Sequence, residues 1–332
     1  MTKRILMQST LALALIGGCA GSQAAVVCVY DPMGGAGELY GLMKDFAVAA
    51  KGFGTDVQLR PYRNEDQVVE DYQAKKCDGM VVTDFAVRDF NNYTGSLNAV
   101  GAIFDKRVAR FMLKLMGNPK LQPDMVQNGH EVAGVFAIGM AYLVVNDRRI
   151  NSLAKAQGIR FGVQDSDPAQ REMVRKLGTA PVPVNVNNMG PMFNTGQVDS
   201  LGAPALAINA FELSKGMGLK GGVVRFPVAL ISGNFVMHPE KFASGFGQNS
   251  RQWFAGQVER TMAAADRQEK LIQPSYWMDL PNEELDGYVR LFREMRVRLV
   301  QQGIYNKKMT STIKKVRCQI DPSQFDCNRD GE

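Results

Sequence analysis

Histidine is scarce in this sequence: His130 and His238 are the only two in 332 residues. So few histidines leave little material for histidine-based catalysis or for a metal site. The sequence also contains no His-Glu-x-x-His, Cys-x-x-Cys or Gly-x-Ser-x-Gly motif, each of which marks a catalytic or metal-binding site. These absences predict a protein that is not an enzyme and that uses no metal or cofactor. A secreted hydrolase is the enzymatic alternative.

Long apolar runs are missing after the N-terminal region. No later segment offers eighteen uninterrupted apolar residues, which excludes a multi-span membrane protein. At the N-terminus, Lys3 and Arg4 precede an apolar stretch at residues 5–18, and Ser22-Gln23-Ala24 supplies the small residues of a cleavage site. Residues 1–24 are therefore predicted to be a signal peptide that exports the mature chain to the periplasm.

The same region allows an alternative at Cys19. Ile16-Gly17-Gly18-Cys19 resembles a lipobox, which would retain Cys19 as a lipidated first residue and hold the chain at a membrane. Against this, the first strand is expected to begin at Ala25 or Val26, which leaves a short tether for a lipoprotein. A free form and an anchored form both remain open at this point.

Strong charge of one sign is absent as well. The formal net charge is +6, and removal of Lys3 and Arg4 with the signal peptide leaves +4. The remaining basic residues are scattered among apolar neighbours, which is typical of a solvated helix face rather than of a nucleic-acid footprint. We therefore expect no nucleic-acid partner.

Four cysteines remain when Cys19 is set aside. An even number suits disulfides in an oxidising compartment, and three pairings are open. We favour Cys28 with Cys77, which lie near strands that we expect to be neighbours, and Cys318 with Cys327, which flank a short turn containing Asp-Pro. The alternative is four free, buried thiols.

The first third of the chain alternates strands and helices. Short apolar strands are predicted at residues 26–30, 57–60 and 79–82, with helical patterns at 39–50 and 65–75 between them. This alternation indicates a parallel sheet, and right-handed crossovers would place the first strand beside the third.

Two later apolar stretches, at residues 132–145 and 223–237, are predicted to cross from one domain to another. The first of them is longer than one small sheet needs. Between them lies a second α/β unit. Its predicted elements, and the helices of the last third, follow in chain order: strand 158–163, helix 169–177, strand 182–184, helix 251–271 and helix 282–302.

Candidate ligand-binding side chains follow the third strand. Open α/β sheets bind ligands at the carboxyl ends of their strands, where this chain has Asp84, Phe85 and Arg88. Phe85 could flank a ligand while Asp84 and Arg88 bind its polar groups; the alternative is a helix-capping Asp84 and a surface Arg88. Arg160 is a further candidate because a guanidinium suits a carboxylate bidentately, although it could also be an edge-strand arginine in solvent.

The middle of the chain resembles the core signature of DctP-type solute receptors of TRAP transporters. The matching motifs are Ile150-Asn-Ser-Leu153, Gly158-Ile-Arg160-Phe-Gly-Val163, Arg175-Lys-Leu-Gly178, Pro181-Val-Pro-Val184 and Phe193-Asn-Thr-Gly196-Gln-Val-Asp199. More narrowly, the chain looks like the AdeT-type solute-binding proteins, which have also been labelled RND efflux accessories. It departs from the sialic-acid-type members in lacking an arginine near residues 140–142.

The resemblance implies an α/β, two-lobed periplasmic-binding-protein-like fold with mixed sheets, hinge-crossing strands and a helical C-terminus. The expected divisions are a signal peptide at 1–24, lobe I at 25–137 plus 228–262, lobe II at 138–227, C-terminal helices at 263–317 and a disulfide-bearing tail at 318–332.

It also implies a receptor that closes on a small organic acid and delivers it to a membrane transporter. Arg160 would grip the ligand carboxylate, Asp84, Phe85 and Arg88 would line the first lobe, and the second lobe would contribute Asn185, Val186 and Asn187. The alternative partner is an efflux system in which the protein is an accessory and transports nothing itself.

Overall fold

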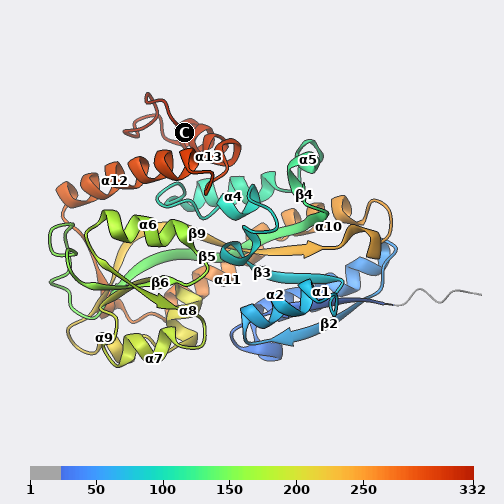
Figure 1. Cartoon of the computed structure of the whole chain (residues 1–332), viewed down its shortest axis with the longest axis horizontal. Helices are drawn as coiled ribbons and strands as arrows, with labels where there is room; N and C mark the ends of the chain where they lie inside the picture. The colour runs from blue at the N-terminus through green and yellow to red at the C-terminus, as the bar shows by residue number, and fades with distance from the viewer. Residues whose placement is uncertain (1–23) are drawn as a thin grey trace, which may run out of the picture.

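The computed structural model describes residues 24–332. Of the predicted signal peptide only Ala24 is among them, and Cys19 lies outside them. Within this range one mixed, ten-stranded sheet has the order β2-β1-β3-β9-β5-β8-β6-β7, with β10 paired to β9 and β4 to β5 (Figure 1). The strands are β1 (Ala25–Tyr30), β2 (Val57–Tyr62), β3 (Gly79–Thr83), β4 (Val126–Gln127), β5 (His130–Val145), β6 (Arg160–Gln164), β7 (Ala180–Val184), β8 (Ser200–Pro204), β9 (Gly222–Met237) and β10 (Trp277–Met278).

The first half of the sheet confirms the predicted parallel arrangement. β1 pairs in parallel with β2 and with β3, so the first strand lies beside the third. The crossovers are α1 (Glu38–Gly52) and α2 (Glu65–Gln73), and α2 begins where the Asn64 side chain accepts a hydrogen bond from the Asp66 N–H. This arrangement brings Cys28 and Cys77 together in a disulfide.

The long strands β5 and β9 join the two halves of the molecule. They pair with each other in antiparallel fashion along most of their length, with register irregularities near Gly139 and Tyr142. One end of β9 pairs with β3, whereas the far end of β5 pairs with β8. Figure 1 shows both strands running from the half that carries α1 and α2 to the half that carries α6 and α7. The crossing inferred from the two apolar stretches is confirmed.

The second half repeats the α/β pattern on a smaller scale. β6 pairs in parallel with β7 and with β8. The helices of this half are α6 (Pro168–Lys176), α7 (Met189–Asn194), α8 (Ala205–Ala210) and α9 (Ser214–Met217). The short helices α3 (Asp84–Val87), α4 (Lys106–Leu115) and α5 (Gln122–Met125) belong to the connection between β3 and β5.

The core forms a layer on each face of the sheet. Successive strand residues point to opposite faces, so Val27 and Val29 pack into one buried cluster with α1, while Cys28 and Tyr30 pack into another. Each face of the sheet therefore buries its own apolar set, and helices cover both.

The last third of the chain forms the helices α10 (Phe246–Gly256), α11 (Val258–Leu271), α12 (Asn282–Gln301) and α13 (Lys307–Ile320). Helices α10 and α11 pack against β5, whereas α12 packs against α6 and α13 against α4. The single helix expected at 251–271 is two helices, because the chain leaves helical geometry at Gln257. No helix within residues 24–332 is both long and apolar enough to cross a membrane.

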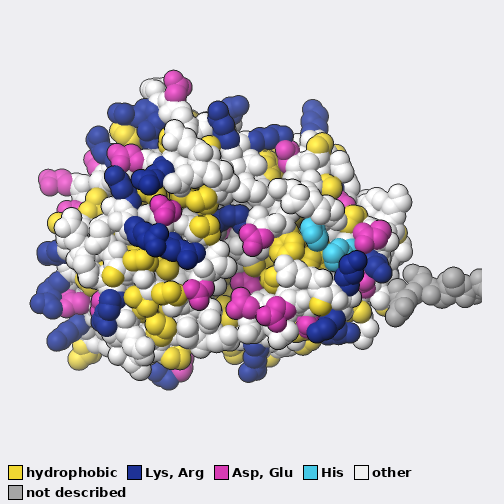
Figure 2. Space-filling model, in the orientation of Figure 1, with side chains coloured by type: hydrophobic (Ala, Val, Ile, Leu, Met, Phe, Trp, Pro, Cys, Tyr) yellow, Lys and Arg dark blue, Asp and Glu magenta, His cyan; other side chains and the backbone are white. Residues whose placement is uncertain are grey.

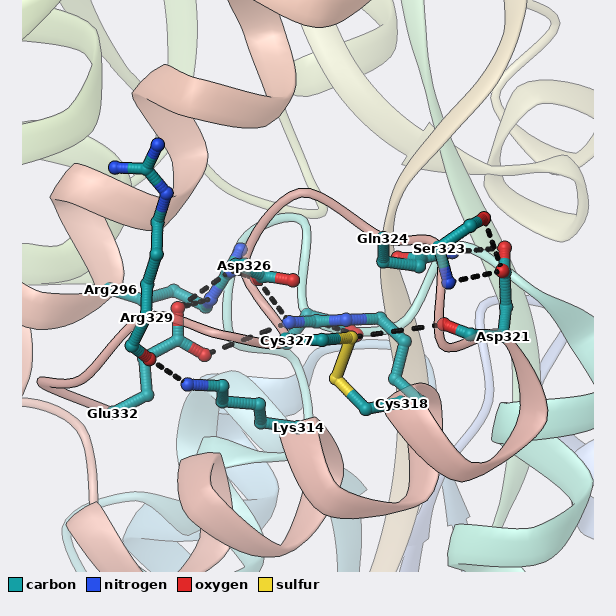
Figure 3. Close-up of a disulfide and its surroundings, with 12 residues drawn as sticks. Arg296, Lys314, Cys318, Asp321, Ser323, Gln324, Asp326, Cys327, Arg329 and Glu332 are labelled. Atoms are coloured by element: carbon teal, nitrogen blue, oxygen red, sulfur yellow. Dashed lines mark hydrogen bonds and ion pairs between the residues drawn. A yellow bond between two sulfur atoms is a disulfide. The ribbon is translucent and has the colours of Figure 1, made fainter.

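The tail folds back onto α12 and α13, as Figure 3 shows. Cys318 and Cys327 form the second disulfide, which is the pairing that we favoured. Beside it, the Arg296 guanidinium donates to Asp326 at 2.9 Å and to Glu332 at 2.8 Å, and all three side chains are buried. Arg296 also donates to the Val100 carbonyl at 2.9 Å. The tail is thereby tied to the first half of the molecule.

Candidate functional site

A cavity of about 150 Å³ lies between the two halves of the sheet. Its walls come from β1, β3 and the segment after β3 on one side, and from β6, β7, β8 and α8 on the other, while α12 covers it. The walls are mainly apolar, and their large side chains include Phe85, Ile138, Phe161, Met173, Leu201, Leu206, Phe211 and Phe292. A solute held there would contact both halves of the molecule at once.

The three candidates that follow β3 have different positions. Phe85 lines the cavity, as expected of a ligand-flanking side chain. Asp84 is completely buried and accepts hydrogen bonds from the Ser232 N–H at 2.9 Å and the Ser232 hydroxyl at 3.2 Å. Burial raises the pKa of Asp84 to about 7. Asp84 thus fastens α3 to β9, and it is not among the side chains that line the cavity.

Arg88 is held by the protein itself. Its guanidinium forms an ion pair with Asp167 and donates to the Asn98 side-chain oxygen at 2.6 Å and to the Gly95 carbonyl at 3.0 and 3.1 Å. Asp167 also caps α6, because its carboxylate accepts the Ala169 N–H at 2.9 Å. Arg88 comes from the first half and Asp167 from the second, so this buried pair bridges the two walls.

The candidates of the second half divide in the same way. Val186 lines the cavity. Asn185 forms a local turn, in which its side-chain oxygen accepts the Asn187 N–H at 2.9 Å, and Asn187 is exposed. Two side chains, Phe85 and Val186, are thus the predicted site residues that the structure brings together around the cavity.

Arg160 lies outside the cavity. It is the first residue of β6, its side chain is half exposed, and it meets Asp199 bidentately, with Nε–Oδ2 at 3.0 Å and Nη2–Oδ1 at 2.7 Å. Asp199 directly precedes β8, which pairs with β6. The Arg160–Asp199 ion pair therefore links the ends of two adjacent strands. The carboxylate that the guanidinium grips is therefore one of the protein's own.

Several polar residues of the cavity had no signal in the sequence. Glu65 begins α2 as an ordinary first-turn acid, yet it is buried, lines the cavity and accepts the Thr83 N–H at 2.5 Å. Burial raises the pKa of Glu65 to about 7. The side-chain nitrogen of Asn98, a residue that lines the cavity, is buried and has no hydrogen-bond partner within the described residues.

The two histidines form a separate cluster. The Tyr72 hydroxyl lies 2.8 Å from His130 Nδ1, and the His238 ring stacks on Tyr72 with centroids 4.2 Å apart. Neither histidine lines the cavity. Figure 2 shows this pair (cyan) on a face where basic and acidic side chains are interspersed.

Comparison with known proteins gives consistent matches along the chain. The family described as "Solute-binding protein AdeT 1/2" matches residues 46–332. "Probable solute-binding protein AdeT1" of Acinetobacter baumannii is 44% identical over 299 residues, which cover 90% of this chain and 98% of that protein.

Solved structures share the fold at low sequence identity. A TRAP periplasmic solute-binding protein from Desulfovibrio salexigens with bound orotic acid matches with a TM-score of 0.71 at 14% identity, over 90% of this chain and 99% of that chain. The sugar acid binding protein DctPAm of Advenella mimigardefordensis, in complex with galactonate, matches with a TM-score of 0.71 at 12% identity over the same shares. The two-lobed α/β fold with a helical C-terminus is that of TRAP solute-binding proteins.

Proposed function

Because this chain belongs to the AdeT 1/2 family of solute-binding proteins, we propose that it is a periplasmic receptor that encloses a small solute between the two halves of its sheet and delivers it to a membrane transporter. The cavity carries this proposal. It is walled by both halves, and the buried side-chain nitrogen of Asn98, one of its lining residues, lacks a hydrogen-bond partner within the described residues. Unsatisfied buried polar groups are costly, so a solute that satisfied them would stabilise the closed protein.

The contacts between the two halves of the molecule indicate how they would close on a solute. Strands β5 and β9 connect the halves through irregular pairing near Gly139, where a small change of backbone angle would move one half against the other. The Arg88–Asp167 pair joins the two walls, so it can form only when they approach. A solute that touches both walls adds its own contacts to this pair and shifts the population toward the closed form.

The structural relatives support a transporter as the partner. One matched solved structure is a TRAP periplasmic solute-binding protein with bound orotic acid, and another is a sugar acid binding protein in complex with galactonate. An exported receptor of this fold would present the closed, loaded form to the transporter and release the solute when the halves separate.

A thermal-shift screen tests the proposal. The screen would use a library of small acids, amides, alcohols and amines, and binding solutes raise the melting temperature by mass action. Ala207, a half-buried cavity residue on α8, is replaced by tryptophan to fill the cavity, and Arg160→Ala is the matched control outside it. We expect solutes that stabilise the wild type and Arg160→Ala but not Ala207→Trp.

Two results would count against the receptor. One is a library without a single stabilising member. The other is stabilisation that Ala207→Trp leaves unchanged although this variant melts cooperatively. Small-angle scattering supplies an independent measurement, because a bound solute should reduce the radius of gyration of the wild type.

A further inference from the structure

We infer that the cavity selects an uncharged, largely apolar solute about the size of one six-membered ring and rejects free carboxylates, an inference that rests on the proposed function. The fold is shared with proteins whose structures contain orotic acid or galactonate. The chemistry of this chain's cavity nevertheless differs from what a carboxylate needs, as its charges, its hydrogen-bonding groups and its volume each indicate.

The charges that line the cavity are acidic. Within residues 24–332, the lining contains Glu65 and Asp167 but no lysine, arginine or histidine. A carboxylate that left water for this site would meet two carboxyl groups and no cation. Burial of an unpaired carboxylate is strongly unfavourable, and no lining cation within the described residues offsets that cost.

The guanidinium of Arg88, which lies behind the cavity wall, already has hydrogen-bond partners within the protein. Arg88 directs its donors at Asp167, Asn98 and the Gly95 carbonyl. The N-terminus of α6, another group that could stabilise an anion, is capped by the same Asp167 carboxylate. Asp167 thus fills the place that a solute carboxylate would otherwise take.

The polar group that remains free suits a neutral polar atom. The Asn98 side-chain nitrogen is buried and unpartnered within the described chain. It is an N–H donor, which matches a carbonyl or hydroxyl oxygen. The raised pKa of Glu65, about 7, reflects the same apolar surroundings.

Volume sets the size of the solute. The cavity measures about 150 Å³, which is roughly the volume of an engineered apolar cavity in another protein that binds benzene. Phe85, Phe161 and Leu201 contribute apolar wall on both sides. One ring or a short branched chain, carrying a single carbonyl or hydroxyl group, fits this space.

Matched pairs of probes test the inference by isothermal titration calorimetry. The two members of each pair have the same shape but differ in charge: benzamide is paired with benzoate, and butyramide with butyrate. Orotate and galactonate are tested as additional acids. We expect each amide to bind the wild type about tenfold or more tightly than its acid, and Ala207→Trp to abolish that binding.

Asp167→Asn provides a gain-of-function test. Asparagine caps a helix about as well as aspartate, so α6 keeps its cap while Arg88 loses its carboxylate partner. The variant should acquire benzoate binding that the wild type lacks, because the freed Arg88 guanidinium can pair with the carboxylate, whereas benzamide should bind the variant no more tightly than it binds the wild type. Failure to gain any acid binding, in a variant that melts cooperatively, would contradict the role assigned to Asp167.

The outcomes separate the inference from the proposed function. If acids bind the wild type as tightly as their amides, or if only amines from the screening library bind, the inferred solute class is wrong. The proposed receptor function would still hold. If no probe and no library member binds, both are wrong.

Discussion

Two buried carboxyl groups, Glu65 and Asp84, show how the fold sets the chemistry of single residues. Each accepts a backbone hydrogen bond, from Thr83 and Ser232 respectively, and in each burial raises the pKa to about 7. An exposed glutamate or aspartate titrates near 4. The apolar surroundings therefore favour the protonated form of both groups.

Glu65 makes the stability of the protein depend on pH. Because its pKa rises from 4.5 to about 7 on folding, its stabilising contribution is complete below about pH 4.5 and is lost as the pH rises through about 7. Glu65→Gln cannot ionise, so the fall in unfolding free energy between pH 5 and pH 8 should be smaller than in the wild type. Urea denaturation at pH 5 and at pH 8 measures the unfolding free energy. Glu283→Gln, a substitution of an exposed residue on α12, is the control. An unchanged pH dependence in Glu65→Gln would contradict this account.

Arg160 is predicted to be dispensable for solute binding. Its pair with Asp199 is half exposed, and such surface pairs contribute roughly 0–1 kcal/mol. Arg160→Ala should therefore lower the unfolding free energy by less than about 1 kcal/mol and leave the affinity for any solute found in the screen unchanged. A large loss of affinity in calorimetry would restore the sequence-based hypothesis that this guanidinium holds the ligand.

At the scale of secondary-structure elements, α10 packs against β5 at Gly134, where the strand has no side chain. A Cβ atom at Gly134 would overlap the ring of Phe254 on α10. Phe254 also stacks with Phe136 of β5, with ring centroids 5.5 Å apart. Glycine at position 134 therefore allows the helix to pack onto the long strand that joins the two halves.

Gly134→Ala is expected to destabilise the protein by about 1–3 kcal/mol, the usual cost of overpacking a core. Gly41→Ala is the matched control, because Gly41 lies inside α1 and a Cβ there would meet no atom within 4 Å. That change should stabilise by roughly 0.5–1 kcal/mol through helix propensity. Denaturant unfolding of both variants measures the contrast, and equal effects would contradict it.

At the scale of the whole molecule, two disulfides fasten the two ends of the described chain. Cys28–Cys77 spans 49 residues and ties β1 to the segment before β3, whereas Cys318–Cys327 spans 9 residues within the tail. The tail in turn contacts the first half through Arg296 and the Val100 carbonyl. Both cross-links restrict the unfolded chain, and the longer loop restricts it more.

Removal of the longer cross-link should therefore cost more stability. The chain-entropy argument gives about 4 kcal/mol for the double variant Cys28→Ala with Cys77→Ala, and about 3 kcal/mol for Cys318→Ala with Cys327→Ala. Equilibrium unfolding of the two double variants shows which disulfide contributes more to the free energy of unfolding. Dithiothreitol should lower the melting temperature of the wild type. It should not change the melting temperature of a variant in which all four of these cysteines are replaced by alanine.

The sequence by itself determined the local structure and the connectivity. Apolar runs and helix signals predicted β1, α1, β2, α2 and β3 in order, and the length of the stretches that became β5 and β9 indicated strands shared by two lobes. These features depend on neighbours along the chain, which a sequence pattern records directly. The motifs of the middle segment also identified the family to which the chain belongs.

Only the tertiary structure decided what each polar side chain faces. Arg160 looked like a ligand anchor until β6 and β8 came together and brought Asp199 to it. Arg88 meets Asp167, 79 residues away in the chain, while Glu65 and Asn98 reach the cavity from segments without a binding motif. Partners and burial of this kind depend on contacts between distant segments, so the charge of the cavity, and with it the class of solute, follows from the packed fold rather than from any local pattern.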